Sequence, residues 1–156
     1  MPVPLAAKGP TVRIEISGPG LPGPVALTSP AVLKQFAVWA GAGVMINRVE
    51  QTEGFIVDWL ETVPGPPAAG PRYTVSFYVT YANRPLESQP EQLAYVVSYE
   101  PDFRVGRGFV YLPGKGDEHF ALNTRTIHRG REGQWFRASD AWDAVVVELL
   151  KPATAN

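Results

Sequence analysis

The segment 72–81 constrains the fold of this chain more than any other part of the sequence. Its ten residues read Arg-Tyr-Thr-Val-Ser-Phe-Tyr-Val-Thr-Tyr, with large apolar or aromatic side chains at every second position from Tyr73. Successive side chains of a strand point to opposite faces, so this alternation predicts a strand with one buried and one solvent-facing side. Two further strand-like runs follow at 93–99 and 108–112. The three runs together predict a sheet at the centre of the fold.

Other strands are predicted on both sides of this central block. Val12, Ile14 and Ile16 alternate with polar residues, and the turn-rich segment 18–24 leads into a short run at 25–28, which predicts a hairpin. The run 54–60 predicts a strand with Phe55, Val57 and Trp59 on one face. Three short runs near the end of the chain are also interpreted as strands: 119–122, 124–127 and 133–137.

Two helices complete the predicted elements. Ser29 and Pro30 are typical of a helix start, and the apolar spacing that follows predicts a helix over 30–40. At the other end of the chain, Ser139 precedes apolar residues at helical spacing, which predicts a C-terminal helix that ends at Pro152. The order of elements predicts an α+β, mostly β fold: a curved antiparallel sheet or partial barrel with two packed helices. A β-sandwich is the alternative.

Length and composition limit the classes of protein that this chain can belong to. A chain of 156 residues with 45% hydrophobic residues suits one domain, with an ordered core expected over about 11–151. It contains no cysteine, which excludes disulfides, thiolate metal sites and a cysteine nucleophile. Ten of the fourteen basic residues are arginine, and Ala, Gly, Pro and Val are abundant, a composition typical of a bacterial, GC-rich genome.

Charge and hydropathy bear on the partners and the compartment. The formal net charge is −1, so the domain has no global attraction to nucleic acid or to anionic lipid. No apolar run approaches the length of a membrane-spanning helix, and the N-terminal residues do not resemble a secretory signal. We therefore expect a cytoplasmic protein without a membrane anchor.

The two histidines and one aspartate are the candidates for metal binding or catalysis. His119 follows two acidic residues and His128 lies nine positions later, but this spacing matches no known metal-ligand motif, so we expect no metal site. Asp58 lies inside an apolar run, where a buried carboxyl group would need a partner. The alternative hypothesis is an enzyme, a small hydrolase or isomerase, that uses Asp58 or the region of His119 and His128.

Residues 104–137 carry an excess of basic side chains, and Arg129 and Arg131 lie shortly before Trp135. Arginines beside aromatic rings can bind single-stranded nucleic acid or a small anionic ligand. The sequence pI of about 6.1 argues against nucleic acid, and a solvated charged face explains the same residues.

The polar face of segment 72–81 suggests a binding role. Tyr78 stands there among threonines and a serine, a hydroxyl-rich surface that could bind a small molecule, a glycan, a protein partner or a second copy of the chain. The chain is accordingly interpreted as a non-enzymatic binding or interaction domain that needs no cofactor. The candidate ligand-binding residues are Tyr78 and Trp135 for stacking, Arg137 for pairing with an anion and His119 for hydrogen bonding. A homo-oligomeric structural subunit is a further alternative.

Overall fold

The computed structural model describes residues 10–66, 70–80, 91–102 and 107–154, with side chains described up to residue 150. Within these residues the chain is mostly β, as predicted, with short helices between and after the strands. The strands are β1 (Thr11–Ser17), β2 (Val25–Leu27), β3 (Met45–Ile46), β4 (Val49–Glu50), β5 (Val57–Val63), β6 (Tyr73–Val79), β7 (Gln92–Glu100), β8 (Phe109–Tyr111) and β9 (Trp135–Ala138). The helices are α1 (Pro30–Leu33), continued by a 3-10 turn over Lys34–Phe36, α2 (Phe120–Thr126) and α3 (Asp140–Thr154).

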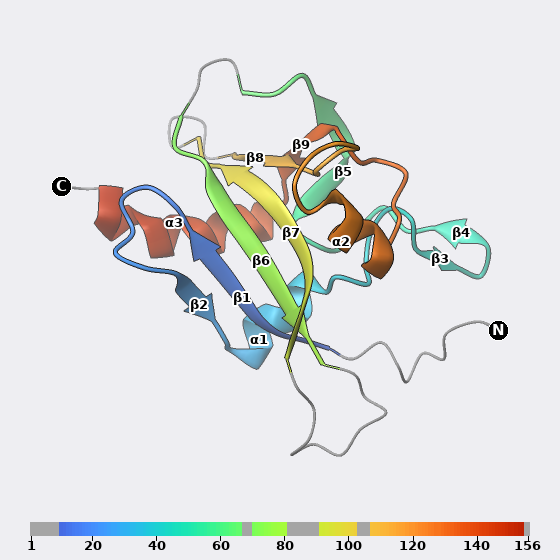
Figure 1. Ribbon diagram of the computed structural model, residues 1–156, viewed down its shortest axis with the longest axis horizontal. Coiled ribbons are helices and arrows are strands. Elements are labelled where there is room, and N and C mark those ends of the chain that lie inside the picture. Colours follow the sequence, from blue (N-terminus) through green and yellow to red (C-terminus); the bar gives the residue numbers. More distant parts are fainter. Residues whose placement is uncertain (1–9, 67–69, 81–90, 103–106, 155–156) are drawn as a thin grey trace.

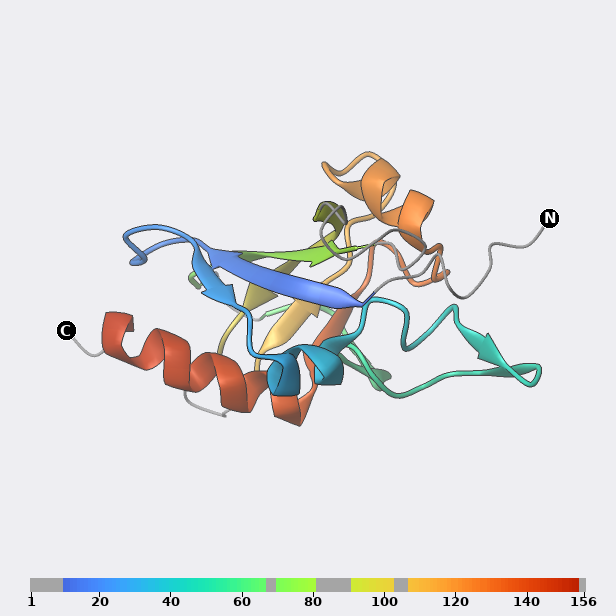
Figure 2. The ribbon, with the colours of Figure 1, turned by 90° about the horizontal axis from the view of Figure 1, so that it is seen from below.

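Seven strands form one antiparallel sheet in the order β2-β1-β6-β7-β8-β9-β5 (Figure 1). The sheet is not closed into a barrel, because β2 and β5 are its two edges. The predicted hairpin between β1 and β2 is confirmed, with Ile14 opposite Leu27. A second small sheet, β3 with β4, projects from the body of the molecule (Figure 2). A single main sheet excludes the sandwich alternative for the described part of the chain.

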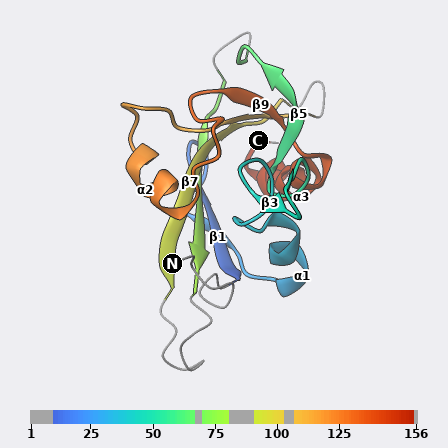
Figure 3. The same cartoon turned by 90° about the vertical axis from the view of Figure 1, so that its right-hand side faces the viewer.

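The helices lie on both sides of the main sheet (Figure 3). α1 and α3 cover one face, and α2 lies on the opposite side, beside β7 (Figures 1 and 2). The face toward α1 and α3 carries the core, and the alternation of β6 is the reason: Tyr73, Val75 and Phe77 are at most 1% exposed. The other face of the sheet carries the polar side chains of the same strands.

The C-terminal helix forms as its sequence pattern predicts, and it contributes to the core. The hydroxyl of Ser139 accepts a hydrogen bond of 3.2 Å from the backbone N–H of Trp142. Trp142, Val146 and Leu150 are fully buried against the sheet. The helix runs to Thr154, so the predicted end at Pro152 is wrong by one half-turn.

The predictions for two other segments need correction. The helix expected over 30–40 is shorter, because the 3-10 turn after α1 ends at Phe36 and Ala37 is already extended. The short strands expected at 119–122 and 124–127 do not form, since α2 spans Phe120–Thr126. The cause is tertiary: the side chains of Asn123 and Thr126 in α2 form hydrogen bonds with the backbone of Val96 and Ala94 in β7. Part of the predicted loop 82–92 and of the turn 100–106 lies outside the described residues.

No helix among the described residues combines the length and the apolar character that crossing a membrane requires.

Candidate functional site

A row of polar side chains crosses the outer face of the main sheet, opposite the core. Strand register places Thr74 of β6 beside Ser98 of β7, Ser98 beside Tyr111 of β8, and Tyr111 beside Trp135 of β9. Neighbouring residues in register share a face, so three hydroxyl groups and an indole ring line up across four strands. Thr74 is exposed, and the other three side chains are half-buried.

The loop between β8 and α2 forms a wall beside this row. The carboxylate of Asp117 accepts a hydrogen bond of 2.5 Å from the Tyr111 hydroxyl and one of 2.8 Å from the backbone N–H of Gly114. The hydrogen bond with Asp117, helped by desolvation, raises the pKa of Tyr111. The bond from Tyr111 and then the one from Gly114 lower the pKa of Asp117. Tyr111 therefore stays protonated and Asp117 stays ionised around neutral pH.

His119 ends this wall and begins α2. Its backbone is left-handed, with φ of 75°, which few residues other than glycine adopt without a local reason. This conformation turns the chain into the helix, and the His119 carbonyl accepts the hydrogen bond from the N–H of Asn123. The imidazole is one-third exposed, and its Nε2 lies 3.5 Å from Glu118.

Arg72 closes the opposite side of the row. Its guanidinium lies over the Trp135 ring, 4.9 Å from the ring centroid, and 3.5 Å from the carboxylate of Glu100. Glu100 is itself buried and accepts a hydrogen bond of 2.6 Å from the backbone N–H of Gly70. Because Arg72 covers the indole face, stacking of a ligand on Trp135 requires Arg72 to move aside. Trp135 also packs against Tyr111, with ring centroids 5.1 Å apart.

These side chains enclose a pocket of about 260 Å³, which we call the polar pocket. Its floor and rim carry hydroxyl, guanidinium, imidazole and carboxylate groups from Arg72, Thr74, Ser98, Tyr111, Asp117, Glu118 and His119. The pocket can both donate and accept hydrogen bonds, and it offers one cationic and two anionic groups.

Of the four residues predicted to bind a ligand, two belong to the polar pocket or its border. His119 lines it, and Trp135 lies behind Arg72 and Tyr111. Tyr78 is on the same face as Thr74 but four residues along β6, about 13 Å away at the usual rise of a strand. Its ring is covered by the guanidinium of Arg13, 4.0 Å from the centroid.

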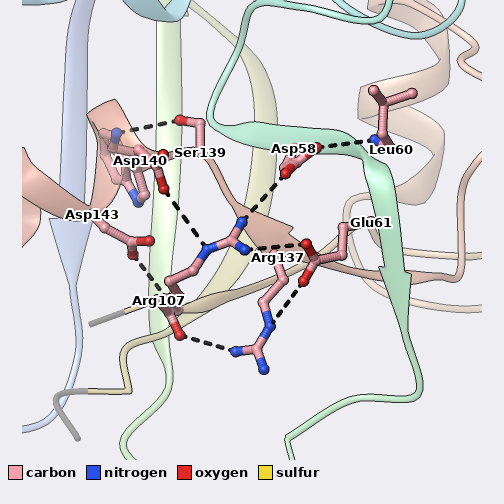
Figure 4. A network of polar contacts seen from close by, with 10 residues as sticks. Asp58, Leu60, Glu61, Arg107, Arg137, Ser139, Asp140 and Asp143 are labelled. Carbon is pink, nitrogen blue, oxygen red and sulfur yellow. Dashed lines mark hydrogen bonds and ion pairs between the residues drawn. The ribbon is translucent and has the colours of Figure 1, made fainter. Parts of the chain in front are cut away.

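Arg137 belongs to a separate network of charges centred on Arg107 (Figure 4). Arg107 contacts Asp58 at 3.3 Å, Glu61 at 3.1 Å and Asp140 at 3.7 Å. Arg137 donates a hydrogen bond of 3.1 Å to the backbone carbonyl of Arg107 and lies 3.5 Å from Glu61. Asp58 and Glu61 of β5 and Arg137 of β9 are thereby tied to Arg107, two residues before β8.

The candidate catalytic groups from the sequence do not come together. Asp58 is half-buried, pairs with Arg107 and accepts a hydrogen bond from the backbone N–H of Leu60. His128 is 67% exposed and lies beyond the far end of α2 from His119, a helix about 10 Å long at the usual rise. Within the described residues, no three His, Asp or Glu side chains are placed to hold a metal ion.

A buried acid next to the Arg107 network was missed by the sequence reasoning. Asp143 on α3 is 5% exposed, and its Oδ1 accepts hydrogen bonds from the Tyr99 hydroxyl at 2.7 Å and from the N–H of Gly108 at 3.0 Å. Desolvation raises the pKa of Asp143, although Tyr99, Gly108 and Arg107 act in the opposite direction. Asp143 directly follows Trp142 in the sequence, and the helical spacing of the apolar residues does not predict that it is buried.

Arg129 was also misjudged, since the sequence reasoning placed it on a solvated basic face. It is 2% exposed, and its guanidinium donates hydrogen bonds of 2.7–2.9 Å to the carbonyls of Val38, Ala40 and Ala42. It donates another of 3.1 Å to the hydroxyl of Tyr95. Arg129 therefore holds the loop after α1 against the sheet and does not form part of a binding surface.

Three other basic side chains of the region 104–137 form ion pairs with acidic residues. Arg107 and Arg137 share the acidic partner Glu61, and Arg131 pairs with Glu50 at 3.1 Å. The comparison of this chain with protein-family models, with curated proteins and with solved structures finds no match. A functional argument therefore rests on the chemistry of the described sites.

Proposed function

We propose that this chain is a binding domain and that the polar pocket holds a small polyhydroxylated ligand, of the size of a monosaccharide. The observation that carries the proposal is the alignment of Thr74, Ser98 and Tyr111 on one face, between Arg72 and the wall that ends at His119. The register of three strands fixes these hydroxyls, so the site is organised before a ligand arrives.

The chemistry of the pocket supports this class of ligand. Sugar hydroxyls donate and accept hydrogen bonds, and the pocket supplies carboxylate acceptors on Asp117 and Glu118 as well as the donor Arg72. Its volume of about 260 Å³ is near the lower end of ligand pockets, which favours a ligand smaller than a typical drug molecule. In this arrangement His119 hydrogen-bonds the ligand.

Residues of the pocket also allow a weaker, enzymatic alternative. His119 lies in the same pocket as the hydrogen-bonded pair of Tyr111 and Asp117, so a proton donor and an acceptor line one cavity. Assembly through the apolar side of α3 has less support, because Trp142, Val146 and Leu150 of that helix are already buried in the core.

The test is a titration of isotope-labelled protein with glucose, galactose, glucuronate and myo-inositol, followed by the amide resonances. We expect at least one of these to shift the amides of Thr74, Ser98 and His119 in a saturable way. Replacing Thr74→Val or Ser98→Ala removes one hydroxyl each and should weaken that binding about fivefold, the loss of one hydrogen bond of about 1 kcal/mol.

Tyr78→Phe is the matched control, since it removes a hydroxyl from the same face of β6 outside the pocket. It should leave the affinity unchanged. The proposal is wrong if none of the four compounds shifts the pocket amides at millimolar concentration, or if the strongest shifts cluster around Tyr78.

A further inference from the structure

A second, apolar groove lies on the other side of the main sheet, between the start of β1 and the segment around α1. Its volume is about 580 Å³, more than twice that of the polar pocket. We call it the apolar groove; it is lined by Pro10, Thr11, Val12, Thr28, Pro30, Leu33, Lys34 and Ala37. Most of this surface is apolar. Pro10 and Pro30 have no backbone N–H group, so they add no hydrogen-bond donor to it.

Two features of the chain leave this groove open. The pairing of β1 with β6 shifts between Thr11 and Arg13, so the bulge at Val12 redirects the beginning of β1. The helical segment after Ser29 stops at Phe36, and Ala37 turns away in an extended conformation with ψ of 131°. A helix running to residue 40, as its sequence suggested, would cover more of this face. The shorter segment ends just before Ala37, which lines the groove together with the buried Leu33.

The polar groups of the apolar groove are few, and two of them have no partner among the described residues. Thr11 is 7% exposed, and its hydroxyl has no hydrogen-bond partner in the described part of the chain. Lys34 is exposed at the edge of the groove, and no acidic group among the described residues lies within ion-pair distance of its ammonium group. The groove therefore combines an apolar wall with one unpaired positive charge and one buried hydroxyl.

We propose that the apolar groove binds an amphipathic anion of low molecular weight, a medium-chain carboxylate. Its alkyl chain lies along Val12, Leu33 and Ala37, and its carboxylate pairs with the ammonium group of Lys34. Charge complementarity selects this occupant over a cationic amphiphile, and the volume falls within the range of about 300–1,000 Å³ found for small-molecule sites. This site is independent of the polar pocket, which lies on the opposite face of the sheet.

The experiment is calorimetric titration of the full chain with octanoate, nonanoate and decanoate below their micellar concentrations. One molecule should bind per chain, and each added methylene should tighten binding about fourfold, as expected for burial of one CH₂ group. Decyltrimethylammonium, with the same chain length and the opposite charge, should bind at least about fivefold more weakly than decanoate.

Two variants at the groove locate the site without changing the core, and a third variant outside the groove is their control. Lys34→Glu should weaken decanoate binding about fivefold or more and should bring the binding of the cationic amphiphile closer to that of decanoate. Lys115→Glu, the same charge change on an exposed residue outside the groove, should leave both affinities unchanged. Thr28→Trp places a large ring at an exposed edge of the groove and should abolish binding.

Several outcomes would overturn the proposal. Equal affinity for decanoate and the cationic amphiphile would mean unspecific adsorption. Methyl contacts between Val3 or Leu5 and Val12, seen by NMR in the free protein, would mean that the N-terminal residues of the chain fill the groove. Resonances of Val12 and Ala37 that change on dilution would mean that a second copy does so. Binding that survives Thr28→Trp would place the ligand elsewhere.

Discussion

The side-chain amide of Asn123 makes two hydrogen bonds to the backbone of Val96, both of 2.8 Å. Its Oδ1 accepts from the Val96 N–H, and its Nδ2 donates to the Val96 carbonyl. β8 pairs with β7 only from Ser98 to Glu100, so the edge of β7 before Ser98 has no neighbouring strand on this side among the described residues. Asn123 substitutes for that strand, and Thr126 adds a hydrogen bond to the Ala94 carbonyl. An unpaired strand edge is thus covered by a helix.

The first prediction follows from this pair. Asn123→Leu should lower the free energy of unfolding by about 2–3 kcal/mol, because two buried backbone groups of Val96 lose their partners. Asn123→Asp should cost at least as much, because it buries a carboxylate at a fully buried position and brings that negative charge against the Val96 carbonyl, to which it cannot donate. Urea denaturation measures both changes. Hydrogen exchange should also show faster exchange at the Val96 amide.

Thr124→Ala is the control for these variants, because the Thr124 hydroxyl bonds only to carbonyls within α2. It should change stability by less than about 1 kcal/mol. A stable Asn123→Leu variant with a protected Val96 amide would show that α2 does not cap β7.

The second prediction concerns Arg129, whose guanidinium satisfies three backbone carbonyls and lies over the rings of Phe55, Trp59 and Tyr95. Arg129→Lys keeps the positive charge. The compact ammonium group of lysine lacks the planar, forked arrangement of donors that a guanidinium has, so it cannot hydrogen-bond all of the same carbonyls. We expect a loss of about 3 kcal/mol or more in thermal or urea unfolding.

Arg131→Lys supplies the comparison, since Arg131 is 39% exposed and makes one ion pair with Glu50. Exposed pairs contribute at most about 1 kcal/mol, so this variant should be close to the wild-type protein. Equal stabilities of the two lysine variants would contradict a structural role for the buried guanidinium.

The third prediction is a pH dependence that comes from Asp143. Burial raises its pKa above the usual value of 3.8, so the native state holds this proton more tightly than the unfolded state. The contribution of Asp143 to stability is then full below pH 3.8 and is lost as pH rises through the folded-state pKa. Asp143→Asn removes the titrating group and keeps an oxygen that can accept from Tyr99.

The unfolding free energies of the wild-type protein and Asp143→Asn should be compared between pH 3.5 and 7. The stability of the variant relative to the wild type should rise with pH across this range, and the other carboxylates largely cancel in the difference. A relative stability that falls with pH would mean that Tyr99, Gly108 and Arg107 outweigh desolvation. Asp143→Ala should lower stability by about 2 kcal/mol, because the hydroxyl and the N–H lose their acceptor.

The fourth prediction separates backbone strain from a steric clash at two glycines. Gly43 and Gly116 both have positive φ, of 90° and 96°. A Cβ at Gly43 would lie 2.6 Å from the Cα of Arg129, whereas a Cβ at Gly116 would meet no atom within 4 Å. Gly116→Ala should cost about 1–2 kcal/mol from the left-handed conformation alone. Gly43→Ala should cost clearly more, and similar melting temperatures for the two would contradict the tight approach of Arg129.

Two segments with a regular local pattern, β6 and α3, were predicted correctly from the sequence. The alternation of β6 and the helical spacing from Trp142 to Leu150 each mark a face that must be buried, and both elements form with that face in the core. The grouping of the residues of the polar pocket was harder to predict. His119 was named as a candidate, but Thr74, Ser98 and Asp117 come together only through strand register and the turn after β8.

The sequence by itself determined which faces are apolar, since periodicity is local and burial of those faces drives folding. It therefore specified a mostly β domain with a terminal helix. Only the tertiary structure decided that 120–126 is a helix, because Thr126 and Asn123 find their partners on a β7 edge far away in the sequence. It also decided that Arg129 is buried. An arginine is stable there only because three carbonyls from the loop after α1 point at one guanidinium, and a contact between such distant residues leaves no local pattern.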